Sequence, residues 1–118
     1  MSYLVGGCKP IRWIKDSIKT PPFSKAARIK AGILLRMLQA GVRLSLPESR
    51  PLPVIGPRCH ELRIRDGPLS WRIIYSLNAD AIVILAVVKK KSRVLPSSTI
   101  STCKNRLEAY TRWEQEKD

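Results

Sequence analysis

Hydrophobic positions recur along this chain with two periods, one typical of helices and one typical of strands. Between residues 25 and 40 apolar side chains return every three or four positions, which predicts an amphipathic helix. Ser24 precedes this segment as an N-cap, and Gly41 follows it where a C-terminal cap is expected. A second helix is predicted over residues 99–116, where the spacing of three and four positions joins Ile100, Cys103, Leu107 and Tyr110.

Four apolar runs have the length and composition of β-strands: residues 11–14, 60–65, 69–77 and 81–90. The last three are separated by short turn segments, such as Asp66-Gly67-Pro68, so they should form an antiparallel meander. Residues 44–57 contain four prolines and are expected to be an extended connection, while a short helical turn could occupy residues 16–19.

The order of these elements predicts an α+β fold. An N-terminal strand and helices, together with a C-terminal helix, should pack on a small, mainly antiparallel β-sheet. The length of 118 residues corresponds to a single domain over 1–118, and a hydrophobic content of 44% is ordinary for a globular protein.

Charge changes this picture, because 22 Lys and Arg face only 9 Asp and Glu, giving a net charge of +13. Most of the cations cannot be neutralised within the chain, so we expect a polyanionic partner such as a nucleic acid. The three cysteines fit no metal or disulfide spacing, no secretory signal is visible, and no apolar run is long enough to cross a bilayer. We therefore expect a cytoplasmic protein with no membrane association.

The candidate binding residues lie on the predicted strands. Side chains alternate along a strand, so Arg63 and Arg65 share one face with Glu61, where they either contact phosphate or are simply solvated. Arg72 lies in the middle of a strand, where a buried arginine needs a partner, either a phosphate or Glu61 on the next strand. Three lysines end the last strand, and either they bind phosphate or they protect a sheet edge: Lys89, Lys90 and Lys91. Only one of Lys90 and Lys91 should point into a site, because neighbouring strand residues face opposite ways.

Three further side chains are candidates for roles at the same site. His60 is the only histidine and the only side chain that titrates near neutral pH without a shift, although a lone strand histidine is more often a surface or packing residue. Tyr75 belongs either to the core or to a stacking contact at the site. Arg93 could steer RNA in the same region.

Several segments in a fixed order resemble one known family. These are PLPVIGP over 51–57, HELRIRDG over 60–67, WRIIY over 71–75, AIVIL over 81–85, the Lys90-Lys91-Ser92 triplet and Pro96. Their order and spacing are similar to those of the phage-derived HigB-like branch of the RelE/ParE superfamily of toxins. The likeness covers residues 10–112, nearly the whole chain.

The resemblance implies the toxin of a type II toxin–antitoxin system. In its best-known form such a toxin is a ribosome-dependent mRNA endoribonuclease, or mRNA interferase, in which a 2′-hydroxyl attacks the adjacent phosphate without a metal or cofactor. Its partners would be mRNA, the ribosome and a cognate antitoxin of the helix-turn-helix, HigA-like type.

The resemblance also implies roles for the candidate residues. Arg72 and either Lys90 or Lys91 would stabilise the transition state, and His60 or a lysine would move the proton. The phosphate- and RNA-binding set would comprise Arg63, Arg65, Lys89, Arg93 and Tyr75.

The chain departs from the family pattern at several positions. Ala86 stands where the family carries a histidine, Val88 and Lys89 replace a Phe-Gln pair, and Ser97 and Ser98 stand where some relatives have a tyrosine. The identity of the general base is therefore open. Two alternatives remain: a ParE-like toxin that inhibits gyrase, and an inactive relative that binds only RNA or its antitoxin.

Overall fold

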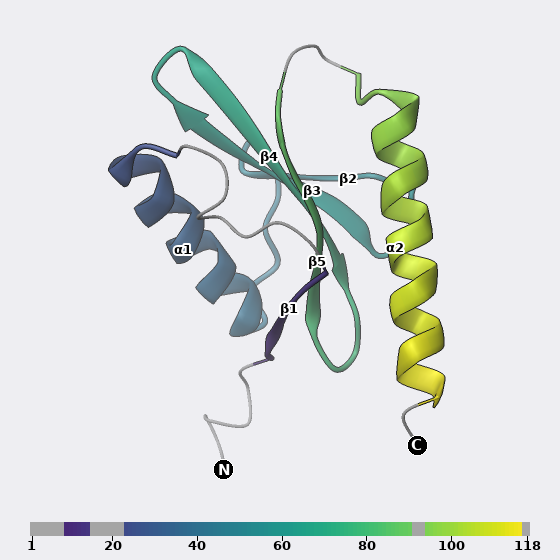
Figure 1. Ribbon diagram of the computed structural model, residues 1–118. Coiled ribbons are helices and arrows are strands. Elements are labelled where there is room, and N and C mark those ends of the chain that lie inside the picture. The colour runs from purple at the N-terminus through teal and green to yellow at the C-terminus, as the bar shows by residue number, and fades with distance from the viewer. Residues whose placement is uncertain (1–8, 15–22, 91–93, 117–118) are drawn as a thin grey trace.

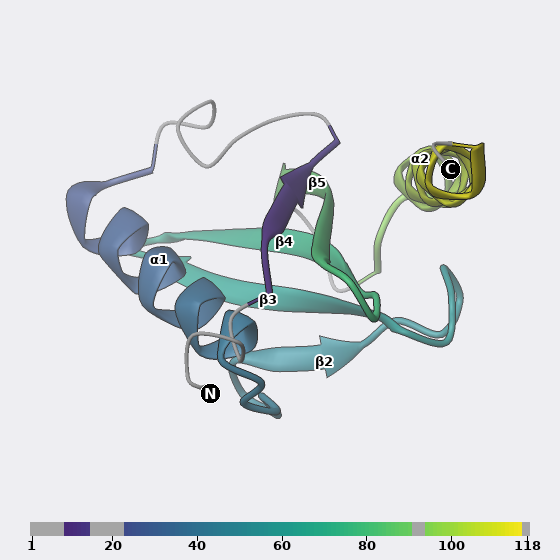
Figure 2. The same ribbon diagram turned by 90° about the horizontal axis from the view of Figure 1, so that it is seen from below.

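The computed structural model describes residues 9–14, 23–90 and 94–116. It contains, in chain order, β1 (Ile11–Trp13), α1 (Lys25–Gln39), β2 (Ser49–Pro51), β3 (Cys59–Asp66), β4 (Leu69–Leu77), β5 (Ile82–Lys89) and α2 (Ser97–Glu116). The strands form one sheet in the order β1-β5-β4-β3-β2, and α1 and α2 lie on its opposite faces (Figures 1 and 2). The predicted α+β class is confirmed. The helical turn considered at residues 16–19 lies outside the described residues.

The sheet is mixed, because β1 runs parallel to β5 while every other pair is antiparallel. The meander β3-β4-β5 is confirmed to within one residue at each end. Residues 44–57, expected to be an extended connection, contain the short strand β2, which pairs with β3 and was not predicted. Its Pro51 is tolerated because β2 is an edge strand, where the missing N–H costs no ladder hydrogen bond.

Helix α1 begins and ends as its sequence predicts. The Ser24 hydroxyl accepts a hydrogen bond from the Ala27 N–H at 3.1 Å, and Gly41 takes a φ of 88°, which favours glycine. The face turned to the sheet packs on alternate residues of β3 and β4, and its buried members are Ala27, Ala31, Leu34, Leu35 and Leu38. One hydrophobic core therefore lies between α1 and the sheet.

The second core lies between α2 and the other face of the sheet. A register shift opposite Ile74 and Tyr75 places Leu85 and Ala86 consecutively on this face, where they pack with Cys103 and Tyr110 of α2. Helix α2 begins at Ser97, two residues earlier than predicted, because Pro96 already accepts backbone hydrogen bonds from its first turn. Among the described residues, neither helix combines the length and the apolar character needed to cross a membrane.

The carboxylate of Asp66 joins α1 to the β3–β4 turn. Its Oδ2 accepts hydrogen bonds from the Ser24 backbone N–H at 3.0 Å and from the Trp71 Nε1–H at 3.2 Å. The hydrogen bonds from Ser24, and to a smaller extent that from Trp71, lower the pKa of Asp66. The charged carboxylate is thus part of the folded structure at neutral pH.

We expect Asp66→Asn to melt at a lower temperature than wild type at pH 7, because the amide keeps an acceptor oxygen but loses the charge. A carboxylate whose pKa is lowered by folding stabilises the protein above its unfolded pKa of about 3.9, and this contribution is lost as the pH falls through the lowered folded value. The difference in Tm should therefore shrink as the pH falls below about 3.9. A thermal melt series from pH 7 to pH 2 tests this, and a difference that does not change with pH would contradict it.

Candidate functional site

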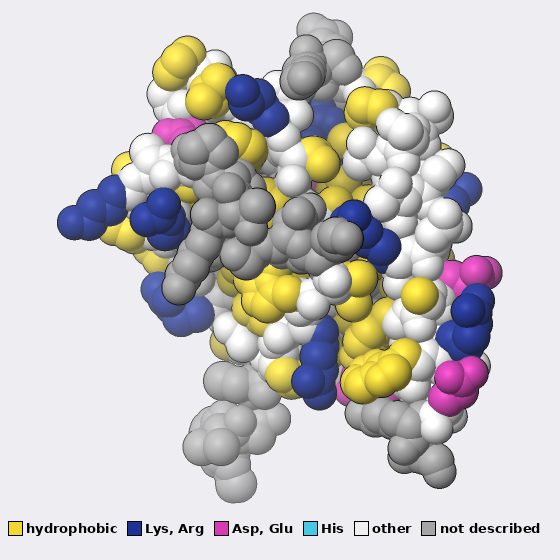
Figure 3. Space-filling view, viewed as in Figure 1, with side chains coloured by type: hydrophobic (Ala, Val, Ile, Leu, Met, Phe, Trp, Pro, Cys, Tyr) yellow, Lys and Arg dark blue, Asp and Glu magenta, His cyan; other side chains and the backbone are white. Residues whose placement is uncertain are grey.

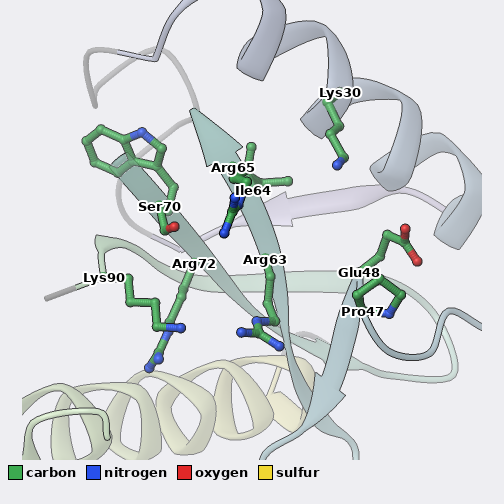
Figure 4. Close-up of a pocket in the computed structure, with 10 residues that line it drawn as sticks. Lys30, Pro47, Glu48, Arg63, Ile64, Arg65, Ser70, Arg72 and Lys90 are labelled. Carbon is green, nitrogen blue, oxygen red and sulfur yellow. The ribbon is translucent and has the colours of Figure 1, made fainter. Parts of the chain in front are cut away.

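A cationic pocket with a volume of about 410 Å³ opens at the end of the sheet where β3 and β4 meet. Of the described residues that line it, five are lysines or arginines and one, Glu48, is an acid (Figure 4). The cations are Lys30 from α1, Arg63 and Arg65 from β3, Arg72 from β4 and Lys90 just after β5. A concave site with this balance of charge is suited to an anionic ligand.

The strand register explains why these side chains meet. Arg63 lies directly opposite Arg72, and the Lys90 N–H donates to the Ser70 carbonyl at 2.8 Å, which extends the β4–β5 ladder by one residue. Figure 4 shows the Arg63, Arg72 and Lys90 side chains pointing to the same side of the sheet. On the β2 side, the Arg63 N–H donates to the Glu48 carbonyl at 2.8 Å and fixes the wall formed by Pro47 and Glu48.

Two guanidinium groups directly opposite each other on neighbouring strands repel, and the repulsion destabilises the pair unless an anion lies nearby. The anion that the chain itself provides is Glu61. This carboxylate is 0% exposed; its Oε1 lies 3.3 Å from Arg72 Nε and its Oε2 lies 2.9 Å from Arg50 Nη2. Glu61 therefore links β2 to β4 across β3.

Arg72 thus occupies both environments that the sequence left open. It is only 2% exposed and forms the ion pair with Glu61, and it also lines the cationic pocket. Its contact with phosphate stays a prediction. The single carboxylate of Glu61 is shared by Arg50 and Arg72. It therefore does not compensate the positive charge of the neighbouring Arg63 as well.

The pKa shifts of Arg72 and Lys90 reflect burial first and the neighbouring positive charges second. Burial lowers the pKa of Arg72, the Glu61 carboxylate opposes that effect, and Arg50 and Arg63 lower it further. Desolvation, followed by the nearby Arg63 and Arg72, lowers the pKa of Lys90. In both groups desolvation is the larger cause of the lowered pKa, and the neighbouring cations add to it.

The structure brings four of the predicted site residues together and places three others, His60, Tyr75 and Lys89, outside that set. Arg63, Arg65, Arg72 and Lys90 share the pocket. His60 and Tyr75 stack on each other, with ring centroids 5.5 Å apart and planes 20° apart, and line a different cavity beside the end of α1. The Tyr75 hydroxyl is bonded to Ser49 Oγ at 2.7 Å.

Strand alternation accounts for this separation. His60 is three residues from Arg63, and Tyr75 is three residues from Arg72, so each pair falls on opposite faces of the sheet. Lys89 does not line the cationic pocket; its Nζ lies 5.9 Å from the centroid of the Trp71 ring, and it shares a neighbouring cavity with Arg72 and Lys90. This parity was available in the sequence. Lys91 and Arg93 lie outside the described residues, so their predicted roles stay predictions.

Four contributors to the site were not found by sequence reasoning: Lys30, Arg50, Glu48 and Ser70. Lys30 belongs to the basic outer face of a predicted helix, but nothing in the sequence indicates which basic residue of that face meets β3. Arg50 and Glu48 lie in or next to β2, which was itself not predicted. Among the described residues, His, Cys, Asp and Glu form no group of three or more that could hold a metal ion.

Comparison with known proteins gives one match. Residues 21–108, well over half of the chain, match the family model described as phage derived protein Gp49-like. No curated protein matches the chain, and no solved structure matches it. The matched region contains α1, the strands β2 to β5 and most of α2, and therefore all the residues that line the cationic pocket.

We expect Glu61→Gln to lower the free energy of unfolding by about 3 kcal/mol or more, because removing one partner of a buried ion pair leaves the other charge buried and uncompensated. The double variant Glu61→Met/Arg72→Met should recover most of that loss, since it removes both buried charges together. Equilibrium unfolding in urea measures the free energy of unfolding of the wild type, the single variant and the double variant.

The matched control is the exposed pair of Glu108 and Arg112 on α2, whose N–O distance is also 3.3 Å. Glu108→Gln should cost less than about 1 kcal/mol, because solvent screens an exposed pair. Equal losses for Glu61→Gln and Glu108→Gln would show that Glu61 does not compensate a buried charge.

Proposed function

Because the chain belongs to the phage-derived Gp49-like family, a family associated with toxin–antitoxin systems, we propose that it is the toxin of a type II pair and cleaves mRNA on the ribosome. The observation that carries this proposal is the convergence of Lys30, Arg63, Arg65, Arg72 and Lys90 on one pocket. The antitoxin would be a helix-turn-helix protein of the HigA type, and the site of action would be the cytoplasm.

The pocket has the charge that an RNA backbone requires. Arginine binds a phosphate through two parallel N–H groups, and the opposed guanidinium groups of Arg63 and Arg72 can hold one phosphate between them. Such a phosphate would also relieve their mutual repulsion, so that ligand binding and the stability of the site act in the same direction. Arg65 and Lys30, at the outer wall, would contact the neighbouring phosphates.

The proposed reaction needs only groups of the RNA and of the protein. The 2′-oxygen attacks the adjacent phosphorus, the bond from phosphorus to the 5′-oxygen breaks, and the products are a 2′,3′-cyclic phosphate and a free 5′-hydroxyl. Negative charge grows on the phosphate oxygens in the transition state. Arg63 and Arg72 would stabilise that charge, which is the largest contribution a preorganised cationic site can make.

Two groups in the pocket are suited to move protons. Lys90 has a lowered pKa and neighbours both arginines, so its ammonium group would donate a proton to the leaving 5′-oxygen. Glu48 is the carboxylate that lines the same cavity and would accept the proton of the 2′-hydroxyl. We assign no proton transfer to His60, because it lies on the opposite face of the sheet.

We expect Arg63→Ala to reduce mRNA cleavage by about 100-fold or more, because it removes a group that stabilises the transition state. Glu48→Gln should reduce cleavage through the loss of the base, while RNA binding is retained. Primer extension on an mRNA under translation measures both, with Arg112→Ala on α2 as a control for general loss of positive charge.

Unchanged cleavage in Arg63→Ala would contradict the assignment of the site. Absence of cleavage by the wild-type protein, together with gyrase-dependent DNA damage, would support the ParE-like alternative.

The pH dependence of cleavage tests the role of Lys90 separately. If its ammonium group is the general acid, activity falls as the pH rises through the pKa of Lys90, which lies below the ordinary lysine value of about 10.4. Lys90→Arg should move this alkaline limb to higher pH, since arginine stays protonated. A single-turnover pH profile on a short RNA measures the limb, and the same limb in both proteins would exclude Lys90 as the acid.

A further inference from the structure

Helix α1 carries an apolar stripe that faces away from the sheet. Ile29 and Ile33, one turn apart, are 54% and 46% exposed, and the half-buried Met37 continues the stripe by another turn. Together with Leu44 these side chains line a groove of about 440 Å³ between α1 and the segment that leads to β2. We call this the α1 groove. Its floor is Leu34, which belongs to the core between α1 and the sheet.

Cations border this apolar stripe. The 15 residues of α1 contain no acidic side chain, and four exposed basic residues lie along the helix: Lys25, Arg28, Lys30 and Arg36. Figure 3 shows dark-blue side chains standing out along α1 at the left of the view, with yellow hydrophobic surface beside them. The surface therefore offers apolar contact and positive charge together.

The α1 groove is continuous with the cationic pocket. Lys30 and Glu48 line both cavities, so a chain segment lying in the groove would end beside the mouth of the pocket. Occupation of the groove could therefore block the approach of an extended RNA without any contact to Arg63 or Arg72.

The side chains that line and border the α1 groove distinguish between the classes of molecule that could bind in it. RNA stacks its bases on aromatic side chains, and none of the residues that line the groove is aromatic. A second copy of this chain would bring its own basic α1 against the same cations, which repel each other. A lipid surface does not enter a concave groove. A protein segment that combines apolar side chains with carboxylates matches both the stripe and its border.

We propose that the α1 groove is the docking site for an apolar, acidic segment of the cognate antitoxin. The apolar side chains of that segment contact Ile29, Ile33 and Met37, and its carboxylates pair with Lys30 and Arg36. The identity of the partner rests on the proposed function, whereas the chemistry of the segment follows from the groove. Neutralisation then results from covering the mouth of the pocket at Lys30.

Ile33→Glu tests the groove, because it places a negative charge in the stripe at an exposed position that should not disturb the core. The matched control is Val54→Glu, since Val54 is 51% exposed and its neighbours Leu52 and Ile55 belong to the core on the α2 side of the sheet. The probe is the purified cognate antitoxin, to be sought as a helix-turn-helix protein encoded beside this gene, and its Kd for each protein is measured by calorimetry. Thermal melts check that both variants are folded.

We expect Ile33→Glu to weaken antitoxin binding by about tenfold or more, as an interface anchor does, and Val54→Glu to change it by less than about twofold. Higher salt should weaken the wild-type complex, because the border contacts are charged. The free Ile33→Glu protein should cleave mRNA at the wild-type rate and need more antitoxin for inhibition.

Equal antitoxin binding by wild type, Ile33→Glu and Val54→Glu would overturn the inference, and so would the absence of any complex with the wild-type protein. Loss of binding to phosphatidylserine vesicles in Ile33→Glu, with the antitoxin complex intact, would also overturn it and assign the stripe to a lipid surface. A wild-type protein that binds the antitoxin through Ile33 but cleaves no RNA would support the groove and reject the nuclease.

Discussion

The structure depends on one buried carboxylate. Glu61 is fully enclosed, contacts Arg72 and Arg50, and so holds together three adjacent strands beside the point where Arg63 and Arg72 face each other in register. Without this anion, Arg63 and Arg72 would be opposed on neighbouring strands with no counter-charge beneath them. The carboxylate makes the cluster possible, but it compensates only part of it. The remainder is the charge that is available to a ligand.

The partial neutralisation of the arginine cluster by Glu61 connects the stability of the sheet with its proposed binding of an anion. A fully neutralised cluster would have little attraction for phosphate, and an uncompensated one would not fold in this arrangement. In the intermediate case found here, desolvation first and the neighbouring cations second lower the pKa values of Arg72 and Lys90. Lys90 gains a second property from it, since a lysine that releases its proton more easily than usual is better suited to acid–base chemistry.

The fold also separates tasks between the two faces of the sheet. One face holds α1, the stacked His60 and Tyr75, and Lys89 over Trp71. The other holds Glu61 and Arg72 beside the α2 core. The cationic pocket reaches across to Lys30 of α1, so the helix that carries the exposed apolar stripe is also a wall of the charged site. This position would allow the proposed protein partner and the proposed nucleic acid to compete without sharing their main contacts.

The sequence alone determined the α+β class, the meander, both helices and the caps of α1, because these follow from local periodicity and from turn and cap residues. It also determined that Arg63 and Arg65 share a face, and parity within each strand already set His60 on the face opposite to Arg63 and Tyr75 on the face opposite to Arg72. Only the tertiary structure decided that Arg72 pairs with Glu61 while lining the pocket, and that Lys30, Glu48 and Arg50 join the site. Those contacts depend on strand register and on helix packing between segments far apart in the chain. No local pattern of residues shows which of these distant segments meet in the folded protein.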